Sequence, residues 1–200
     1  MPSPIGHALA GAAIAWLSDL PPGHTSRTGK HESRRWNRAN ADPHLALACA
    51  GLATLPDADL LLPIAHRTVT HSVTAVAAVA LFMIVATGVT GKVTPRAGLA
   101  CVTAYASHLL LDWLQADPTP PFGIQLFWPM SSEWFISGWE IFRGTERQHL
   151  LEAATIARNA VAVGQEVAIL GPVAAAAWLV RIKALSRLAT EMARRHHSPE

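Results

Sequence analysis

Two neighbouring stretches decide the fold: VTAVAAVALFMIVATGVT at residues 73–90 and PRAGLACVTAYASHLLLD at residues 95–112. The first holds 18 residues without a charge, which is the lower edge of what can cross a lipid bilayer. Thr94 followed by Pro95 is typical of a helix N-cap and first helical position, so a second helix begins there. No stretch alternates apolar and polar residues as a half-buried strand does. The pair predicts a helical hairpin.

The hydropathy of this hairpin favours a membrane over the alternative, a soluble helical domain whose apolar helices form its core. Half of the chain is hydrophobic, 15% is charged, and the mean hydropathy is +0.24, which is unusually apolar for a soluble domain. We therefore predict an all-α, membrane-embedded helical bundle. It comprises one helical domain over residues 1–186 and a basic tail over residues 187–200.

Three further apolar runs extend this bundle. Residues 167–180 form a long run that only Pro172 interrupts. Residues 5–17 and 45–55 are too short to span a bilayer alone, so we expect partly embedded helices there. Two cysteines sit alone in such runs, which predicts buried thiols and excludes a disulfide framework or a thiolate zinc cluster.

The net charge of +2 is small, but it is unevenly distributed. Residues 19–44 hold five Lys and Arg against three acids, and residues 181–200 hold five against two. The rest of the chain holds six against nine. The flanks are basic and the centre is acidic, a balance that gives no reason to expect a nucleic-acid partner. Binding of nucleic acid by the basic tail alone is the remaining alternative.

Most of the central His and Asp residues lie in four short clusters. His108 and Asp112 stand four apart on the second helix and share one face, where they can ligate a metal together. Both are costly in an apolar helix unless they are paired or coordinated, and an intrahelical hydrogen bond is the alternative. The clusters are Gly6-His7, Pro56-Asp57-Ala58-Asp59, the heptapeptide HRTVTHS at residues 66–72, and Ser107-His108-Leu109-Leu110-Leu111-Asp112.

Helix geometry brings these clusters together. Helices over residues 71–89 and 95–112 each run about 27 Å at about 1.5 Å per residue, so His71 and Asp112 meet at one end of the hairpin. The intervening loop carries the second cluster and His66 to the same pole, and His7 joins them if residues 5–17 lead away and residues 45–55 lead back. Imidazole and carboxylate ligands without thiolate suit Zn²⁺, Mn²⁺ or Fe²⁺.

Together these motifs resemble a family of small bacterial inner-membrane metal-dependent hydrolases. That family's pattern is Gly-His, Leu-Pro-Asp-x-Asp, His-Arg-Gly-x-Thr-His-Ser, Ser-His-x-x-x-Asp, then a Gly and Leu-x-x-Pro. The likeness covers residues 1–130 and ends in Gly123 and the tetrapeptide LFWP at residues 126–129; Thr68 stands where the family has Gly. The resemblance implies a multi-pass inner-membrane protein that hydrolyses its substrate with a bound metal.

That family is similar in turn to the all-helical zinc phospholipases C and the zinc nucleases that cleave single strands. Their His and Asp order matches His7, Asp57, His71, His108 and Asp112. The chain departs from them in starting with Met1 rather than a mature tryptophan. It also offers only His149 with Glu146 or Glu152 in place of a second His-x-x-x-Asp/Glu helix. This implies one or two metals, not three.

The resemblance and the chemistry of metal sites together assign roles. A metal-activated water would be the nucleophile, with Asp59 or His66 orienting it or acting as base. Arg67 would hold a phosphate oxygen; the alternative is a surface cation that pairs with Asp57 or Asp59. The predicted metal ligands are His7, Asp57, His71, His108 and Asp112, and zinc is the expected ion, with manganese or iron as alternatives.

Eight of the thirteen aromatic residues fall within residues 113–142, which favours an aromatic belt at the membrane interface over a lid on the substrate. We expect membrane lipids and a small or lipid-like phosphoester as partners. The alternative function is metal binding or transport without hydrolysis. Ionisable residues along the full depth of several helices would favour transport, and here they gather at one end.

Charge also predicts an orientation. On this helical path residues 19–44, 91–96 and 181–200 share the pole away from the site and hold 12 of the 16 Lys and Arg. Without residues 19–44, that pole still leads by seven to four. Because short loops rich in Lys and Arg stay in the cytoplasm, the site is expected to face the outside of the inner membrane.

Overall fold

The computed structural model describes residues 2–20, 43–62, 65–117, 120–147 and 149–196, and within them the chain is helical. Two isolated bridges, between Gln115 and Phe142 and between Ile124 and Phe135, are the β-pairing seen in these residues. The all-α prediction is confirmed. In chain order the elements are α1 (Pro4–Ser18), α3 (Pro43–Thr54), the 3₁₀ turns η1 (Leu55–Leu61) and η2 (Val69–His71), α4 (Val73–Thr90), α5 (Pro95–Trp113) and α6 (Ala153–His196).

The predicted hairpin is present as α4 and α5. The Ser72 hydroxyl oxygen accepts the backbone N–H of Ala75 and caps α4, which ends at Gly91 with φ of 60°. A left-handed residue at this position suits glycine, because no Cβ opposes it. The Thr94 hydroxyl then accepts the N–H of Ala97, which begins α5 as the Thr94-Pro95 signature predicts. The chain therefore reverses within four residues.

Small residues pack α1, α3 and α5 closely. Cys49 and Cys101 are buried free thiols in a shared core of small side chains, as the sequence predicts. A Cβ added at Gly11 of α1 would lie 2.4 Å from the Cys49 carbonyl oxygen of α3. A backbone approach this close requires glycine at the contact, and small residues of this kind are a common way for helices to associate in membranes.

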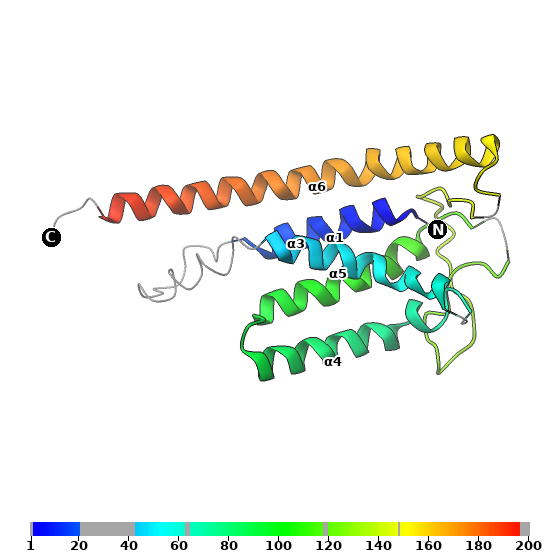
Figure 1. The fold of residues 1–200 in the computed structure, drawn as a ribbon, viewed down its shortest axis with the longest axis horizontal. Coiled ribbons are helices and arrows are strands. Elements are labelled where there is room, and N and C mark those ends of the chain that lie inside the picture. Colours follow the sequence, from blue (N-terminus) through cyan, green and yellow to red (C-terminus); the bar gives the residue numbers. More distant parts are fainter. Residues whose placement is uncertain (1, 21–42, 63–64, 118–119, 148, 197–200) are drawn as a thin grey trace.

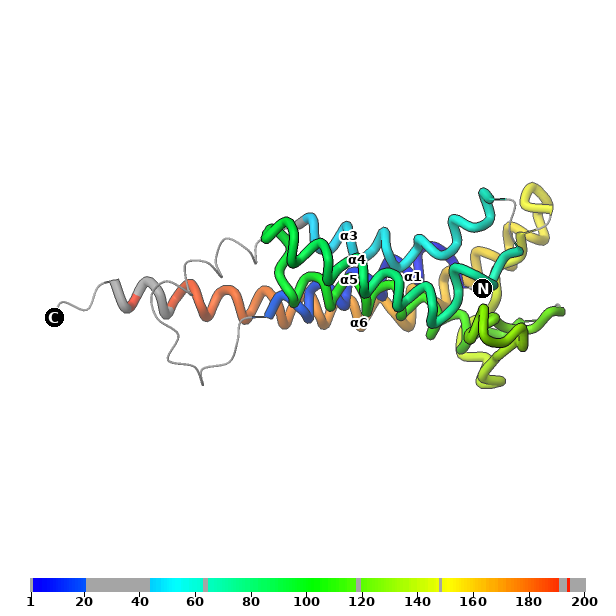
Figure 2. Tube along the Cα trace, turned by 90° about the horizontal axis from the view of Figure 1, so that it is seen from below, coloured from blue at the N-terminus to red at the C-terminus, as the bar shows by residue number. Residues whose placement is uncertain are grey.

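The longest helix, α6, runs the length of the bundle and projects beyond it at its C-terminal end (Figures 1 and 2). It packs on α1, where Ala174 and Ala177 meet Ala13. The apolar run interrupted by Pro172 is part of this single 44-residue helix. The helix also continues across the predicted boundary between residues 186 and 187, and that division of the chain stays a prediction.

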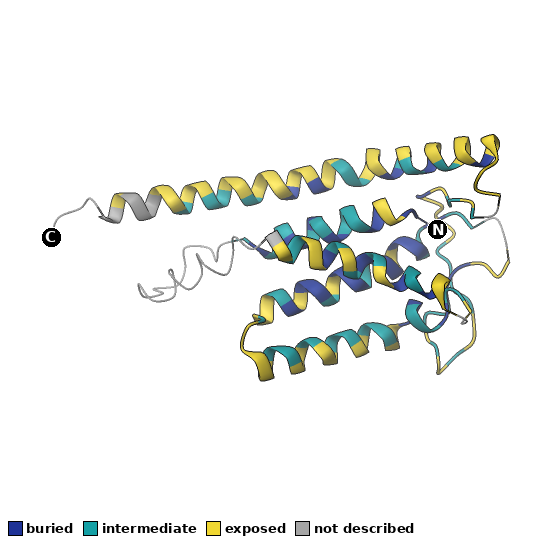
Figure 3. Cartoon of the chain, viewed as in Figure 1, coloured by how far each residue is buried: buried dark blue, intermediate teal, exposed yellow. Residues whose placement is uncertain are grey.

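The surface of α4 is apolar and open. Its 18 residues have a mean hydropathy of 2.2 with none of them buried, and α6 contains a window of 1.6 with 11% buried. Phe82, Ile84 and Val89 of α4 are 65%, 69% and 80% exposed. Figure 3 shows exposed residues along α4 and α6, and buried ones concentrated on α5. A soluble core helix would be covered, so this surface fits lipid contact instead.

The two poles of the bundle are distinct, as the predicted helical path requires (Figure 1). One pole carries the start of α1, the turns η1 and η2, the end of α5, and the non-helical chain between α5 and α6. That chain holds most of the clustered aromatics, among them exposed Trp139 and buried Phe142. The opposite pole carries the turn between α4 and α5 and the end of α6. Most of the predicted basic stretch, residues 21–42, lies outside the described residues.

Candidate metal centre

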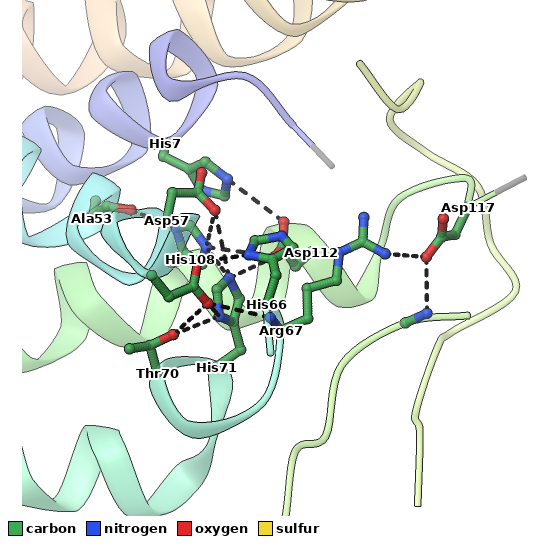
Figure 4. Close-up of polar contacts among 12 residues, drawn as sticks. His7, Ala53, Asp57, His66, Arg67, Thr70, His71, His108, Asp112 and Asp117 are labelled. Atoms are coloured by element: carbon green, nitrogen blue, oxygen red, sulfur yellow. Dashed lines mark hydrogen bonds and ion pairs between the residues drawn. The ribbon is translucent and has the colours of Figure 1, made fainter. Parts of the chain in front are cut away.

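The His and Asp clusters converge at the first pole (Figure 4). His7 comes from the first turn of α1, Asp57 and Asp59 from η1, His71 from η2, and His108 and Asp112 from the end of α5. Five of these six side chains are fully buried, namely His7, Asp59, His71, His108 and Asp112. Residues separated by more than a hundred positions thus share one polar centre inside an apolar bundle.

Four residues form a compact set: Asp57, His71, His108 and Asp112 each offer a ligand atom, all within 4.8 Å of one another. His71 Nε2 lies 3.5 Å from Asp57 Oδ1 and 3.4 Å from Asp112 Oδ2. His108 Nε2 lies 3.5 Å from each of the same two oxygens. Ligand atoms around a tetrahedral zinc ion, with bonds of about 2.1 Å, stand about 3.4 Å apart. The spacing therefore fits one ion.

Hydrogen bonds fix the orientation of both imidazoles. His108 Nδ1 lies 2.7 Å from the Ala53 carbonyl oxygen, so Nδ1 carries the proton and donates it there. His71 Nδ1 lies 2.9 Å from the Thr70 hydroxyl, which itself donates to Asp59 Oδ2. The two Nε2 atoms face each other at 3.0 Å, and in rings that keep their proton on Nδ1 both are available to bind a cation. Two lone pairs directed at one point are suited to binding a cation.

Several buried polar atoms at this centre have no hydrogen-bond partner among the described residues. They are both ring nitrogens of His7, Oδ1 of Asp57 and both carboxylate oxygens of Asp112. An unpaired buried carboxylate is expensive, and the same atoms are satisfied if they surround a positive ion. The residues present therefore fit a divalent metal, with a set of oxygen and imidazole ligands that suits zinc, manganese or iron.

His7 lies beside the set of four. Its ring stacks on His108 with centroids 3.8 Å apart, and its Nε2 is 3.6 Å from Asp112 Oδ1. The N-terminus that carries it is held by fully buried Glu166 of α6, which accepts the Ser3 N–H at 2.8 Å and the Ser3 hydroxyl. The five predicted ligands thus come together, and direct ligation by His7 stays a prediction.

Asp59 lies behind His71. Its carboxylate accepts from His66 Nδ1 at 2.6 Å and from the Arg67 backbone N–H at 3.3 Å, and it is 3.3 Å from His71 Nδ1. Burial opposes the charge, but the hydrogen bonds from His66 and His71 outweigh burial and hold the pKa of Asp59 well below its ordinary value. Asp59 is therefore an ionised carboxylate that orients His71.

Burial and hydrogen bonding also shift the pKa values of Asp57 and His66. Burial raises the pKa of the Asp57 carboxyl, yet its contacts with His108 and His71 prevail and the net shift is downward. Burial lowers the pKa of His66, whose side chain is 21% exposed. Asp57 is therefore in the ionised form that a metal ligand needs.

Arg67 occupies a strained position next to these groups. Its φ is 63°, which is uncommon for a residue other than glycine and typical of functional sites. The guanidinium Nη1 donates to Asp117, which also accepts the Gly123 N–H at 3.0 Å. The alternative pairing predicted for Arg67, with Asp57 or Asp59, is therefore wrong: its side chain pairs with Asp117, and only its backbone N–H reaches Asp59.

A second His-x-x-x-Asp/Glu helix does not contribute to the centre within the described residues. His149 Nδ1 lies 3.3 Å from Glu152 Oε1, and both side chains are more than 60% exposed. Glu146 also lies in the chain before α6. Sequence reasoning missed Asp117, Thr70 and the Ala53 carbonyl, which orient the centre. Thr70 was inside a recognised motif, whereas a backbone carbonyl and a lone aspartate carry no motif signal.

Lipid-facing helices joined to a buried His/Asp centre define a membrane protein with a candidate metal site at one pole. The chain belongs to the YdjM inner membrane protein family, whose model matches residues 1–188. Neither the curated proteins nor the solved structures contain a match to it. The family confirms the predicted inner-membrane protein, and two helices long enough to span agree with it.

Proposed function

We propose that the chain is a membrane-bound metal-dependent hydrolase of phosphoester bonds. The observation that carries this proposal is the convergence of the Nε2 atoms of His71 and His108 and the carboxylates of Asp57 and Asp112, which lie within 4.8 Å of one another. Zinc is the proposed ion, and manganese and iron accept the same ligands. A divalent ion bound there would activate a water by lowering its pKa towards neutrality.

The surrounding residues support hydrolysis more than passive binding. His66 is oriented by Asp59 through Nδ1 and is partly exposed, so its Nε2 is the proposed proton acceptor. Asp59 itself acts by orienting His66 and His71. Arg67 is the proposed phosphate-binding cation, because a guanidinium matches phosphate oxygens with paired donors. A structural metal site would need neither a partly exposed His/Asp pair nor an arginine.

The position of the centre supports a substrate at the membrane surface. It lies at the pole that also carries the aromatic chain between α5 and α6, where Trp113 and Trp139 pack with centroids 6.4 Å apart. Tryptophans are typical of the boundary between lipid and water. We propose a small or lipid-like phosphoester, and the aromatic segment can act both as interface belt and as substrate contact.

The proposal is tested by metal analysis of the detergent-purified protein, together with a panel of phosphomonoesters and phosphodiesters. At least one transition metal per chain is expected, and His108→Ala or Asp112→Ala should lower its content and abolish hydrolysis. His149→Ala is the matched control, since its side chain is 69% exposed and outside the centre. Full occupancy in both site variants would remove this helix from the ligand set. Metal retained without hydrolysis of any ester would favour the alternative, a metal-binding or transport protein.

A further inference from the structure

The chain between α5 and α6 returns along the side of α6, and two side-chain amides hold it there. Asn159 Oδ1 accepts the backbone N–H of Glu146 at 2.7 Å, and its Nδ2 donates to the Glu146 carbonyl at 2.9 Å. Gln165 makes the same kind of pair with the Arg143 N–H and the Ile141 carbonyl, at 3.1 Å each. Because each amide binds both a donor and an acceptor of the backbone, the segment before residue 147 is fixed in register.

This clamp fixes the backbone of Glu146, and Arg147 is the next residue. Its guanidinium interacts electrostatically with Asp57, Asp59 and Asp112, and with Arg67. Its Nη2 is buried and has no hydrogen-bond partner among the described residues. A buried, unpaired guanidinium nitrogen is costly, so this donor is expected to have a ligand.

Arg67 offers a second donor of the same kind. Its Nη1 is taken by Asp117, while its Nε is buried and unpaired within the described part of the chain. Two guanidinium groups on separate segments thus each keep one buried donor without a hydrogen-bond partner among the described residues. The paired donors of a guanidinium match the oxygens of a phosphate group.

We propose that Arg67 and Arg147 form a two-arginine cradle for the phosphoryl group of a phosphomonoester. The inference rests on the proposed function and narrows its substrate class. A phosphomonoester has three non-ester oxygens, one for each arginine and one for the side facing Asp57, His71, His108 and Asp112. A diester has only two, so it leaves one of these three cationic positions without an oxygen. The cradle therefore selects monoesters over diesters.

Binding of inorganic phosphate to the metal-loaded protein, measured by titration calorimetry in detergent, tests the cradle directly. Arg147→Gln should weaken binding about 10- to 100-fold, as expected for loss of a charge-assisted contact. Arg143→Gln is the matched control on the same segment, because its side chain is exposed, and it should bind as the wild type does. Metal content and thermal unfolding of each variant identify any that fail to fold.

Two further measurements separate this inference from the proposed function. Asn159→Ala removes the clamp but no charge, and should weaken phosphate binding while metal content stays the same. In the hydrolysis panel, Arg147→Gln should lower the monoester rate more than the diester rate. Phosphate binding that depends on Arg147 in a protein that hydrolyses nothing would support the cradle and refute the hydrolase. Wild-type protein that binds no phosphate, or equal affinity in Arg147→Gln and the wild type, would overturn the cradle.

Discussion

The close approach of α1 and α3 leads to opposite expectations for alanine substitutions at two glycines, Gly11 and Gly51. Gly11→Ala places a Cβ 2.4 Å from the Cys49 carbonyl oxygen, 2.8 Å from its carbon and 2.9 Å from the Ala53 Cβ. Ordinary contacts begin at 3.4 Å, so the helices must separate by about 1 Å. The obstacle is backbone, which cannot turn aside as a flexible side chain does.

The free-energy change follows from two opposing contributions. Overpacking of this kind costs about 1–3 kcal/mol, and replacing a helical glycine by alanine returns about 0.5–1 kcal/mol. Gly11→Ala should therefore destabilise the protein, by up to about 2.5 kcal/mol. Gly51→Ala, on the same helix pair, has no atom within 4 Å of the new Cβ. It should leave stability unchanged or raise it by up to about 1 kcal/mol.

The same displacement reaches the metal centre. Ala53 of α3 lies against Gly11 of α1, and its backbone carbonyl oxygen accepts the hydrogen bond that orients His108. Separating the helices should therefore lengthen that hydrogen bond and weaken metal binding in Gly11→Ala but not in Gly51→Ala. Thermal unfolding and metal titration of the two variants in detergent measure both effects. Equal stability of the two variants would refute the close approach of α1 and α3.

Three other results are expected. Glu166→Ala leaves two donors of Ser3 without an acceptor, so unfolding in detergent should show a loss of about 2–3 kcal/mol, and Glu166→Gln, which keeps one acceptor oxygen, a smaller loss. Asp59→Asn removes the charge that orients His71, and metal titration should show affinity about 10- to 100-fold weaker with no change in fold by circular dichroism. A reporter enzyme fused after Arg187 should be active in the cytoplasm, because basic residues dominate that pole; activity only outside the cytoplasm would place the metal centre on the cytoplasmic side.

The helical hairpin could be predicted from sequence because its signals are local. Thr94 and Pro95 specify where α5 begins, and uninterrupted apolar composition specifies α4. The predicted limits agree with the structure to within two residues at each end of both helices. The length of α6 was harder to predict from sequence, because Pro172 is typical of a helix interruption. The helix continues through Pro172, and Ala174 and Ala177 just after it pack on α1.

The residues of the centre could be predicted from sequence, but most of the hydrogen bonds and ion pairs among them could not. Helix lengths alone bring His71 and Asp112 to one pole, and the structure places them 3.4 Å apart. Arg67 pairs with Asp117 because the chain after α5 folds back towards it. Asp117 belongs to no recognisable sequence motif, so this pairing could not be predicted. Arg147 was visible only as a basic residue at the correct pole. The residue before it, Glu146, is held by Asn159 of α6, a tertiary contact that no local pattern predicts.

The arrangement of the helices explains how an apolar bundle tolerates such a polar centre. α5 is the helix that carries His108 and Asp112, and it is also the one with the most buried residues, covered by α1, α3 and α4. α4 carries no ionisable residue and has no buried residue, so it meets lipid in place of α5. Ionisable side chains in a membrane are tolerated when they face the bundle interior and a partner or ion. The difference in hydropathy between α4 and α5 is therefore a consequence of the site, because the apolar α4 separates lipid from α5, which carries the candidate metal ligands.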